Sequence, residues 1–179
     1  MHLTQSILQL IDLRSFSNLW YWIVLAVGWS SITHWVLGVP HDLIMRARRR
    51  GGEAAEDMLA LLRVHLRRIL YIEKEGGLVL TVFVSFLLST LAVTGFFYHL
   101  EFSQALFLLL FPYTLVWLLN LRAAGRIAAL IAAAPPNLEQ LTDSLLRHRL
   151  RIQILGMLAI VVTALWGMMQ NLTYSVLGG

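Results

Sequence analysis

Four long stretches of the sequence contain no Asp, Glu, Lys or Arg, and they constrain the fold more than any other feature. They cover residues 19–39, 76–98, 103–121 and 152–172. A helix that crosses a hydrocarbon core of about 30 Å needs roughly 20 residues. Because lipid offers no hydrogen-bond partner to the backbone, each stretch must satisfy its own N–H and C=O groups, as a helix does. The sequence therefore predicts an all-α integral membrane protein with four transmembrane helices in a single membrane domain, residues 1–179.

The connections between these stretches carry almost all of the basic residues. Of the 14 Lys and Arg residues, eight fall in the connection 40–75 and five in the connection 122–151, which leaves only Arg14 elsewhere. Basic connections stay on the cytoplasmic side of the membrane. We therefore expect two cytoplasmic loops, with both termini outside, in a multi-pass protein of the bacterial inner membrane. Charged residues make up 13% of the chain, against about 25% in soluble domains, which excludes an ordinary soluble enzyme or nucleic-acid-binding domain.

Both cytoplasmic connections have a helical pattern, so we expect them to form helices that extend the spans into a cytoplasmic layer. Apolar residues share one face in each connection, and such faces outside the bilayer must be covered by something. The two faces could pack together, lie on lipid or hold another protein. We predict that these apolar faces and a basic run bind a protein partner and anionic lipid headgroups; the residues concerned are Met58, Leu62, Ile69, Leu141, Leu145, Arg46, Arg48, Arg49 and Arg50.

Several short signals predict local structure around the spans. Pro135–Pro136 indicates a turn, and Asn137 followed by Gln140 is typical of a helix N-cap. Apolar residues between 7 and 13 predict a short interfacial helix on the outer side. Gly156 predicts close approach of a neighbouring helix to the fourth span.

Histidines are the candidates for a cofactor site, because the chain contains no cysteine. His34 is the one histidine within the first span, and we expect it to form an interhelical hydrogen bond, for example to Thr81 in the second span. A haem held by two histidines is the sharper alternative, with His65 and His148 as further candidates. The pattern indicates no metal site and no catalytic residue, and it requires no cofactor, although haem stays open.

Four segments spread over nearly the whole chain carry a family resemblance. They are residues 12–20 (Asp-Leu-Arg-Ser-Phe-Ser-Asn-Leu-Trp), 34–40 (His-Trp-Val-Leu-Gly-Val-Pro), the basic run 46–52, and 156–171 with its Thr-Ala-Leu-Trp-Gly-Met motif. The chain resembles a family of small alphaproteobacterial inner-membrane proteins often labelled "component of SufBCD complex". The resemblance implies a link to iron–sulfur cluster assembly but assigns no activity, catalytic residue or cofactor. A chain without thiolates is not suited to holding such a cluster itself.

These observations favour a non-enzymatic accessory, assembly or scaffold subunit of an inner-membrane protein complex. The supporting features are the missing catalytic groups and the amphipathic cytoplasmic helices. Two alternatives stay open: a small membrane redox or haem-binding protein that uses His34 or the cytoplasmic histidines, and the small subunit of a secondary transporter. We expect the partners to be membrane lipids and other membrane protein subunits, and not nucleic acid.

Overall fold

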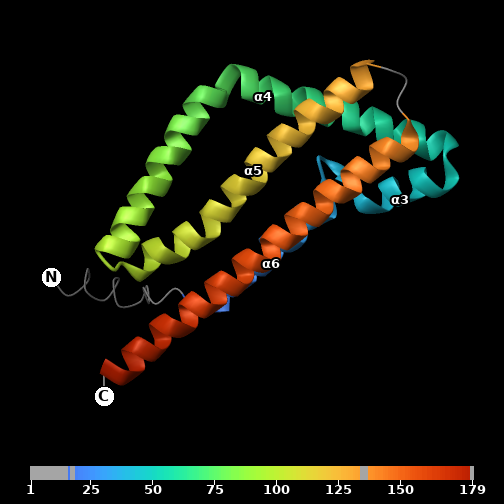
Figure 1. The fold of residues 1–179 in the computed structure, drawn as a ribbon. Helices are drawn as coiled ribbons and strands as arrows, with labels where there is room; N and C mark the ends of the chain where they lie inside the picture. Colours follow the sequence, from blue (N-terminus) through green and yellow to red (C-terminus); the bar gives the residue numbers. More distant parts are fainter. Residues whose placement is uncertain (1–15, 17–18, 134–136, 178–179) are drawn as a thin grey trace.

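The computed structural model describes residues 16, 19–133 and 137–177, and these residues are almost entirely helical (Figure 1). In chain order the elements are α2 (Leu19–His34), β1 (Trp35–Val36), β2 (Val39–Pro40), α3 (His41–Arg50), α4 (Gly52–Ala92), the π-helical turn η2 (Val93–Phe97), α5 (Glu101–Ala133) and α6 (Leu138–Leu177). The interfacial helix predicted between residues 7 and 13 and the turn at Pro135–Pro136 lie outside the described residues.

Three helical segments of the described chain are long and apolar enough to cross a membrane. They are Gly52–Phe97, Glu101–Ala132 and Leu138–Leu172. They contain the predicted spans 103–121 and 152–172, and all of the span 76–98 except Tyr98. Each helix continues past its apolar part, so the predicted helices of the connections are extensions of the spans. The N-cap prediction is also confirmed, because Asn137 Oδ1 accepts hydrogen bonds from the N–H groups of Glu139 and Gln140 at 3.0 and 3.4 Å.

The first predicted span, residues 19–39, forms a shorter helix than expected. Helix α2 ends at His34 and has 16 residues, a length of about 24 Å. In a longer helix, Pro40 would lack the N–H needed for the helical hydrogen bond, and its ring would collide with the carbonyl group of Val36. The helical prediction is therefore corrected for residues 35–39.

Residues 35–40 form a two-stranded hairpin in place of the last helical turn. Val36 pairs with Val39 in antiparallel register, and the two turn residues Leu37 and Gly38 have φ values of 49° and 80°. Positive φ at both central positions is the pattern of a type I′ turn, which suits the twist of a hairpin. Val36, Leu37 and Val39 are all buried, so the tip of the hairpin lies within the protein core.

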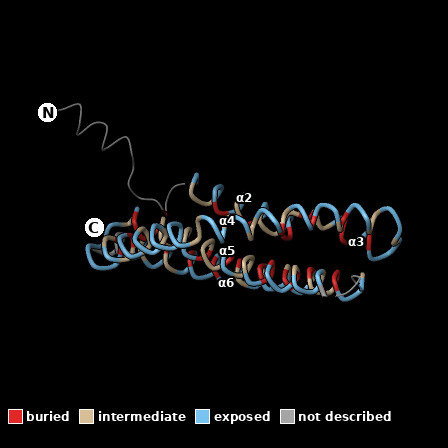
Figure 2. Tube along the Cα trace, turned by 90° about the horizontal axis from the view of Figure 1, so that it is seen from above, coloured by how far each residue is buried: buried red, intermediate tan, exposed pale blue. Residues whose placement is uncertain are grey.

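The helices pack around two apolar cores. The first joins the hairpin, α3, the beginning of α4, the end of α5 and the beginning of α6. The second is smaller and joins α2, α5 and α6 through Leu25, Trp29, Val116, Ile152 and Ala159. Figure 2 shows the buried positions along the sides on which the helices face one another, with exposed positions on the outer sides. The first core is built mostly from the predicted cytoplasmic connections.

Trp29 attaches α2 to two other helices. Its ring contacts Tyr113 of α5 edge to face, with a centroid distance of 5.3 Å. The same ring lies on Gly156 of α6, where an added Cβ would be 2.8 Å from the ring atom Cε3. The prediction that Gly156 permits close helix approach is therefore confirmed.

Helix α4 turns a corner in its middle (Figure 1). The corner falls in the stretch that contains Gly76–Gly77, and glycine is a common cause of helix kinks. Before the corner α4 packs in the first core, whereas beyond it the side chains are largely uncovered, as Leu78 is 82% exposed. Only 6% of the most apolar part of this helix is buried, against 28% in each of the other two candidate spans. We call residues 78–90 the α4 arm.

Candidate functional site

The apolar stripes predicted to hold a partner belong to one internal core. Met58 and Leu62 of α4 share this core with Leu141 and Leu145 of α6, and all four side chains are buried. Ile69 packs against its edge. Packing them inside the chain removes their apolar surface from water without any partner. The prediction that these side chains form a partner surface is therefore corrected.

The arginines of α3 lie on the outside of this core. Arg46 pairs with Asp42 one helical turn earlier at 3.1 Å, and Arg48 pairs with Asp143 of α6 at 2.9 Å. Arg49–Arg50 are exposed and form no ion pair within the described part of the chain. Exposed ion pairs contribute less than about 1 kcal/mol each. These arginines therefore stay accessible to the lipid headgroups proposed for them.

His34 is not held between helices as predicted. It is the last residue of α2, it is exposed, and its ring meets the ring of Trp35 edge to face at 5.8 Å. The hydroxyl group of Thr81 donates to the carbonyl oxygen of Gly77 in its own helix, at 2.7 Å. The predicted bond between His34 and Thr81 is therefore corrected: each side chain has a local partner instead.

The other two histidines have different partners again. The ring of His65 packs on Gly38 at the tip of the hairpin. His148 of α6 is 2% exposed, and its Nε2 lies 2.8 Å from Oδ1 of Asn120 in α5. No hydrogen bond or ring contact joins two of the three candidate histidines in the described part of the chain, and no group of three or more His, Asp or Glu residues there is arranged to hold a metal ion.

Arg149 of α6 connects the end of α2 to the beginning of α3. Its Nε donates to the carbonyl oxygen of Thr33 at 3.1 Å, and its Nη1 donates to Nε2 of His41 at 3.4 Å. The last carbonyl groups of a helix lack partners within the helix and attract cations. Burial, with the charge of Arg149 as a smaller cause, lowers the pKa of His41 below 6.5, which keeps its imidazole neutral and able to accept this bond.

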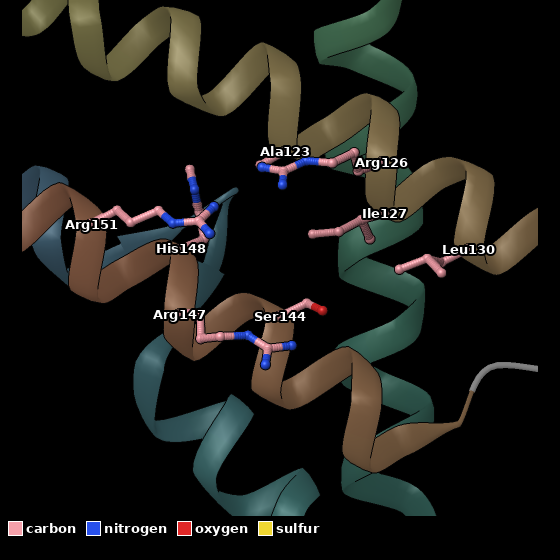
Figure 3. A pocket seen from close by; sticks show the side chains of 8 residues that line it. All are labelled: Ala123, Arg126, Ile127, Leu130, Ser144, Arg147, His148 and Arg151. Atoms are coloured by element: carbon pink, nitrogen blue, oxygen red, sulfur yellow. The ribbon is translucent and has the colours of Figure 1, made fainter.

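A cavity of about 370 Å³ lies between α5 and α6 (Figure 3), lined by Ala123, Arg126, Ile127, Leu130, Ser144, Arg147, His148 and Arg151. We call it the arginine pocket. Its lining contains three arginines, one from α5 and two from α6, and no carboxylate. None of the three forms a salt bridge with any described residue. Asp143, one turn before Arg147, is paired with Arg48 of α3 instead.

His148 is the only other titratable residue in this lining. Because Oδ1 of Asn120 can only accept, Nε2 of His148 donates, and Nδ1 is the unprotonated nitrogen. Nδ1 is buried without a hydrogen-bond partner among the described residues. Burial, assisted by the charges of Arg126 and Arg151, lowers the pKa of His148 to about 4. His148 is therefore neutral at pH 7, and the charge of the pocket comes from the arginines.

A second cavity, of about 400 Å³, lies between α2 and α5 and is mostly apolar. It is lined by Ser31, Ile32, Trp35, Tyr113, Val116, Trp117 and Asn120. Asn120 belongs to this cavity and its partner His148 to the arginine pocket. The hydrogen-bonded pair therefore contributes to the walls of both cavities, near the predicted boundary between membrane and cytoplasm.

Sequence reasoning missed three polar residues that organise the structure. Asn120 holds His148, and Arg149 holds α2 and α3. Gln104, which is buried, donates to the carbonyl oxygen of Gly95 at 2.8 Å and accepts from Nε1 of Trp166 at 3.0 Å. The two amides had a usable signal, since an uncharged amide within an apolar span commonly bonds another helix. Nothing in the sequence separates Arg149 from its neighbouring arginines.

The described residues thus provide two cavities, one lined by arginines and one mostly apolar, which the hydrogen-bonded pair His148–Asn120 connects. Guanidinium groups without carboxylate partners can hold an anion through charge-assisted hydrogen bonds. Comparisons with protein-family models, with curated proteins and with solved structures give no match to the chain.

Proposed function

We propose that the chain is a non-enzymatic accessory or assembly subunit of an inner-membrane protein complex. The observation that supports this role best is the α4 arm. The other two candidate spans pack against each other and against α2, whereas the arm leaves its apolar side chains uncovered by the rest of the chain. A transmembrane helix of a partner subunit would cover this surface.

One side of the α4 arm suits close contact with another helix. Thr81, Ser85 and Ser89 of the arm follow Gly77, the residue just before it, at intervals of four, so all four lie on one face of the helix. The three hydroxyl-bearing residues are exposed. Small residues at such spacing let two helices approach closely in a membrane, where the contact is stabilised by van der Waals packing.

The extramembrane core favours presentation of the arm in one position. The first part of α4 is buried there through Met58, Leu62 and Leu66, together with α3, α5 and α6. Because these apolar stripes are used within the chain, the proposed partner surface moves from the cytoplasmic helices to the membrane. The proposal therefore assigns anchoring to the cytoplasmic layer and partner contact to the arm.

The proposal includes four spans, with α2 as the first and both termini outside. It rests on the 13 of 14 basic residues in the connections 40–75 and 122–151. A reporter active only in the periplasm should be active when fused after Gly179 and silent when inserted at Gly51–Gly52. The reverse pattern would overturn the orientation.

Site-specific photocrosslinking in intact cells tests the partner surface. A photoreactive residue at Phe86 on the α4 arm should yield one discrete adduct with a membrane protein. The matched control is Leu165 on α6, which is also apolar and exposed and should yield only lipid adducts. Lipid adducts alone at both positions would contradict the proposed role. The family resemblance makes iron–sulfur assembly machinery the first class of partner to look for in the adduct.

A further inference from the structure

We propose that the arginine pocket binds the phosphate group of an anionic phospholipid from the cytoplasmic leaflet. The pocket brings together Arg126 of α5 with Arg147 and Arg151 of α6 (Figure 3). Three like charges around one cavity repel one another unless an anion lies between them, and no carboxylate lines the cavity. This site is separate from the basic run of α3, and it does not depend on the partner subunit proposed above.

The position of the pocket along the helices matches the headgroup layer. Arg126 lies five residues beyond the apolar stretch 103–121, and Arg147 lies five residues before the stretch 152–172. At 1.5 Å per residue, both are about 7.5 Å outside the hydrocarbon core, while Arg151 is about 1.5 Å outside it. The headgroup layer of each leaflet is about 5–7.5 Å thick. The three guanidinium groups therefore span the depth at which lipid phosphates lie.

The chemistry of the lining suits a phosphate group. Guanidinium groups donate pairs of parallel hydrogen bonds that match phosphate oxygens. Nε of Arg126 already donates to the carbonyl oxygen of Arg122 at 3.2 Å, which holds the side chain and leaves its terminal nitrogens to donate elsewhere. Ser144 adds a hydroxyl donor. A choline headgroup would bring its own cation towards three arginines, so an anionic headgroup is preferred.

Lipid binding to the purified full-length chain in an uncharged detergent tests this assignment. The probes are short-chain phosphatidylglycerol, short-chain phosphatidylcholine and inorganic phosphate. The pocket variant combines Arg126→Gln, Arg147→Gln and Arg151→Gln. The matched control combines Arg63→Gln, Arg67→Gln and Arg68→Gln, three exposed arginines of α4 that do not line the pocket, and it removes the same charge.

We expect phosphatidylglycerol to bind the unchanged chain at least about tenfold more tightly than phosphatidylcholine. Each arginine should contribute a factor of about tenfold or less to the affinity. The pocket variant lacks all three, so it should raise the Kd for phosphatidylglycerol by about 100-fold. The α4 control should change it by less than about threefold. If the pocket variant does not fold, the exposed Arg147→Gln change alone should still raise the Kd by several-fold.

Three results would overturn the assignment. An equal loss in the pocket variant and the α4 control would show general charge attraction. An unchanged Kd in the pocket variant would place the lipid elsewhere. Binding of inorganic phosphate as tight as that of phosphatidylglycerol, lost in the pocket variant, would make the ligand a soluble phosphate and refute the lipid as its source.

Discussion

Replacing Gly38 by alanine tests the hairpin that takes the place of the last turn of the first predicted span. Gly38 has a φ of +80°, and an added Cβ would be 2.2 Å from Cγ of His65. A left-handed conformation costs a residue with a side chain about 1–2 kcal/mol, and displacing a packed ring costs about 1–3 kcal/mol more. Gly38→Ala should therefore lower the free energy of unfolding by about 3 kcal/mol.

Gly52 provides a matched control for this change. It has a φ of +53°, but no heavy atom lies within 4 Å of an added Cβ. Gly52→Ala should therefore cost only the backbone share, about 1–2 kcal/mol. In a His65→Ala background the ring is gone, so adding Gly38→Ala should also cost about 1–2 kcal/mol.

The measurement is denaturant unfolding in detergent micelles, followed by circular dichroism. The reasoning would be refuted if Gly38→Ala and Gly52→Ala lowered the free energy of unfolding equally. Equal cost of Gly38→Ala with and without the His65 ring would refute it as well, because the coupling between the two positions is the signature of the contact.

Three further predictions concern His148, Leu62 of the first core, and Arg149. The pKa of His148 is about 4 in the folded chain and about 6.5 unfolded, so the unfolded state binds more protons between these values. The free energy of unfolding should fall by about 2 kcal/mol, allowing for solvent screening, as pH drops from about 6.5 to about 4. Above about pH 6.5 this contribution should not change with pH. If His148→Gln left the pH dependence of the free energy of unfolding unchanged, the prediction would be contradicted. Leu62→Ala should cost about 3 kcal/mol, whereas Leu61→Ala, at a position 40% exposed, should cost less than about 0.5 kcal/mol; similar losses in denaturant unfolding would count against the core. Arg149→Met removes both hydrogen bonds of that side chain and should cost about 2 kcal/mol by thermal unfolding, with no loss being the refuting result.

The sequence by itself determined the three longest helices and the apolar parts that make them long enough to cross a membrane. Uncharged stretches such as 76–98 and 152–172 have one stable backbone conformation in lipid, because each N–H must find a carbonyl within the same segment. Asn137 was equally readable as an N-cap, since the bond it makes is local. Such features depend on residues a few positions apart, so they can be predicted from the sequence alone.

The end of the first helix depends on a mixture of local and distant contacts. Pro40 and Gly38 disfavour a helix beyond His34, and this signal was available in the sequence. The prediction of a span over residues 19–39 instead followed the high mean hydropathy of the whole stretch. What holds the hairpin in place is the core that receives Val36 and Val39, and those contacts come from other helices.

Only the tertiary structure decided which apolar faces are covered and which cations meet. Helical periodicity places Leu62 and Leu141 each on an apolar face but does not say that the two faces share one core. It likewise assigns Arg126 and Arg147 to separate helices, and the pocket between them exists because α5 and α6 pack side by side. Helix pairing depends on the fit of side chains that lie far apart in the chain, so the first core and the arginine pocket arise from folding and not from any local pattern.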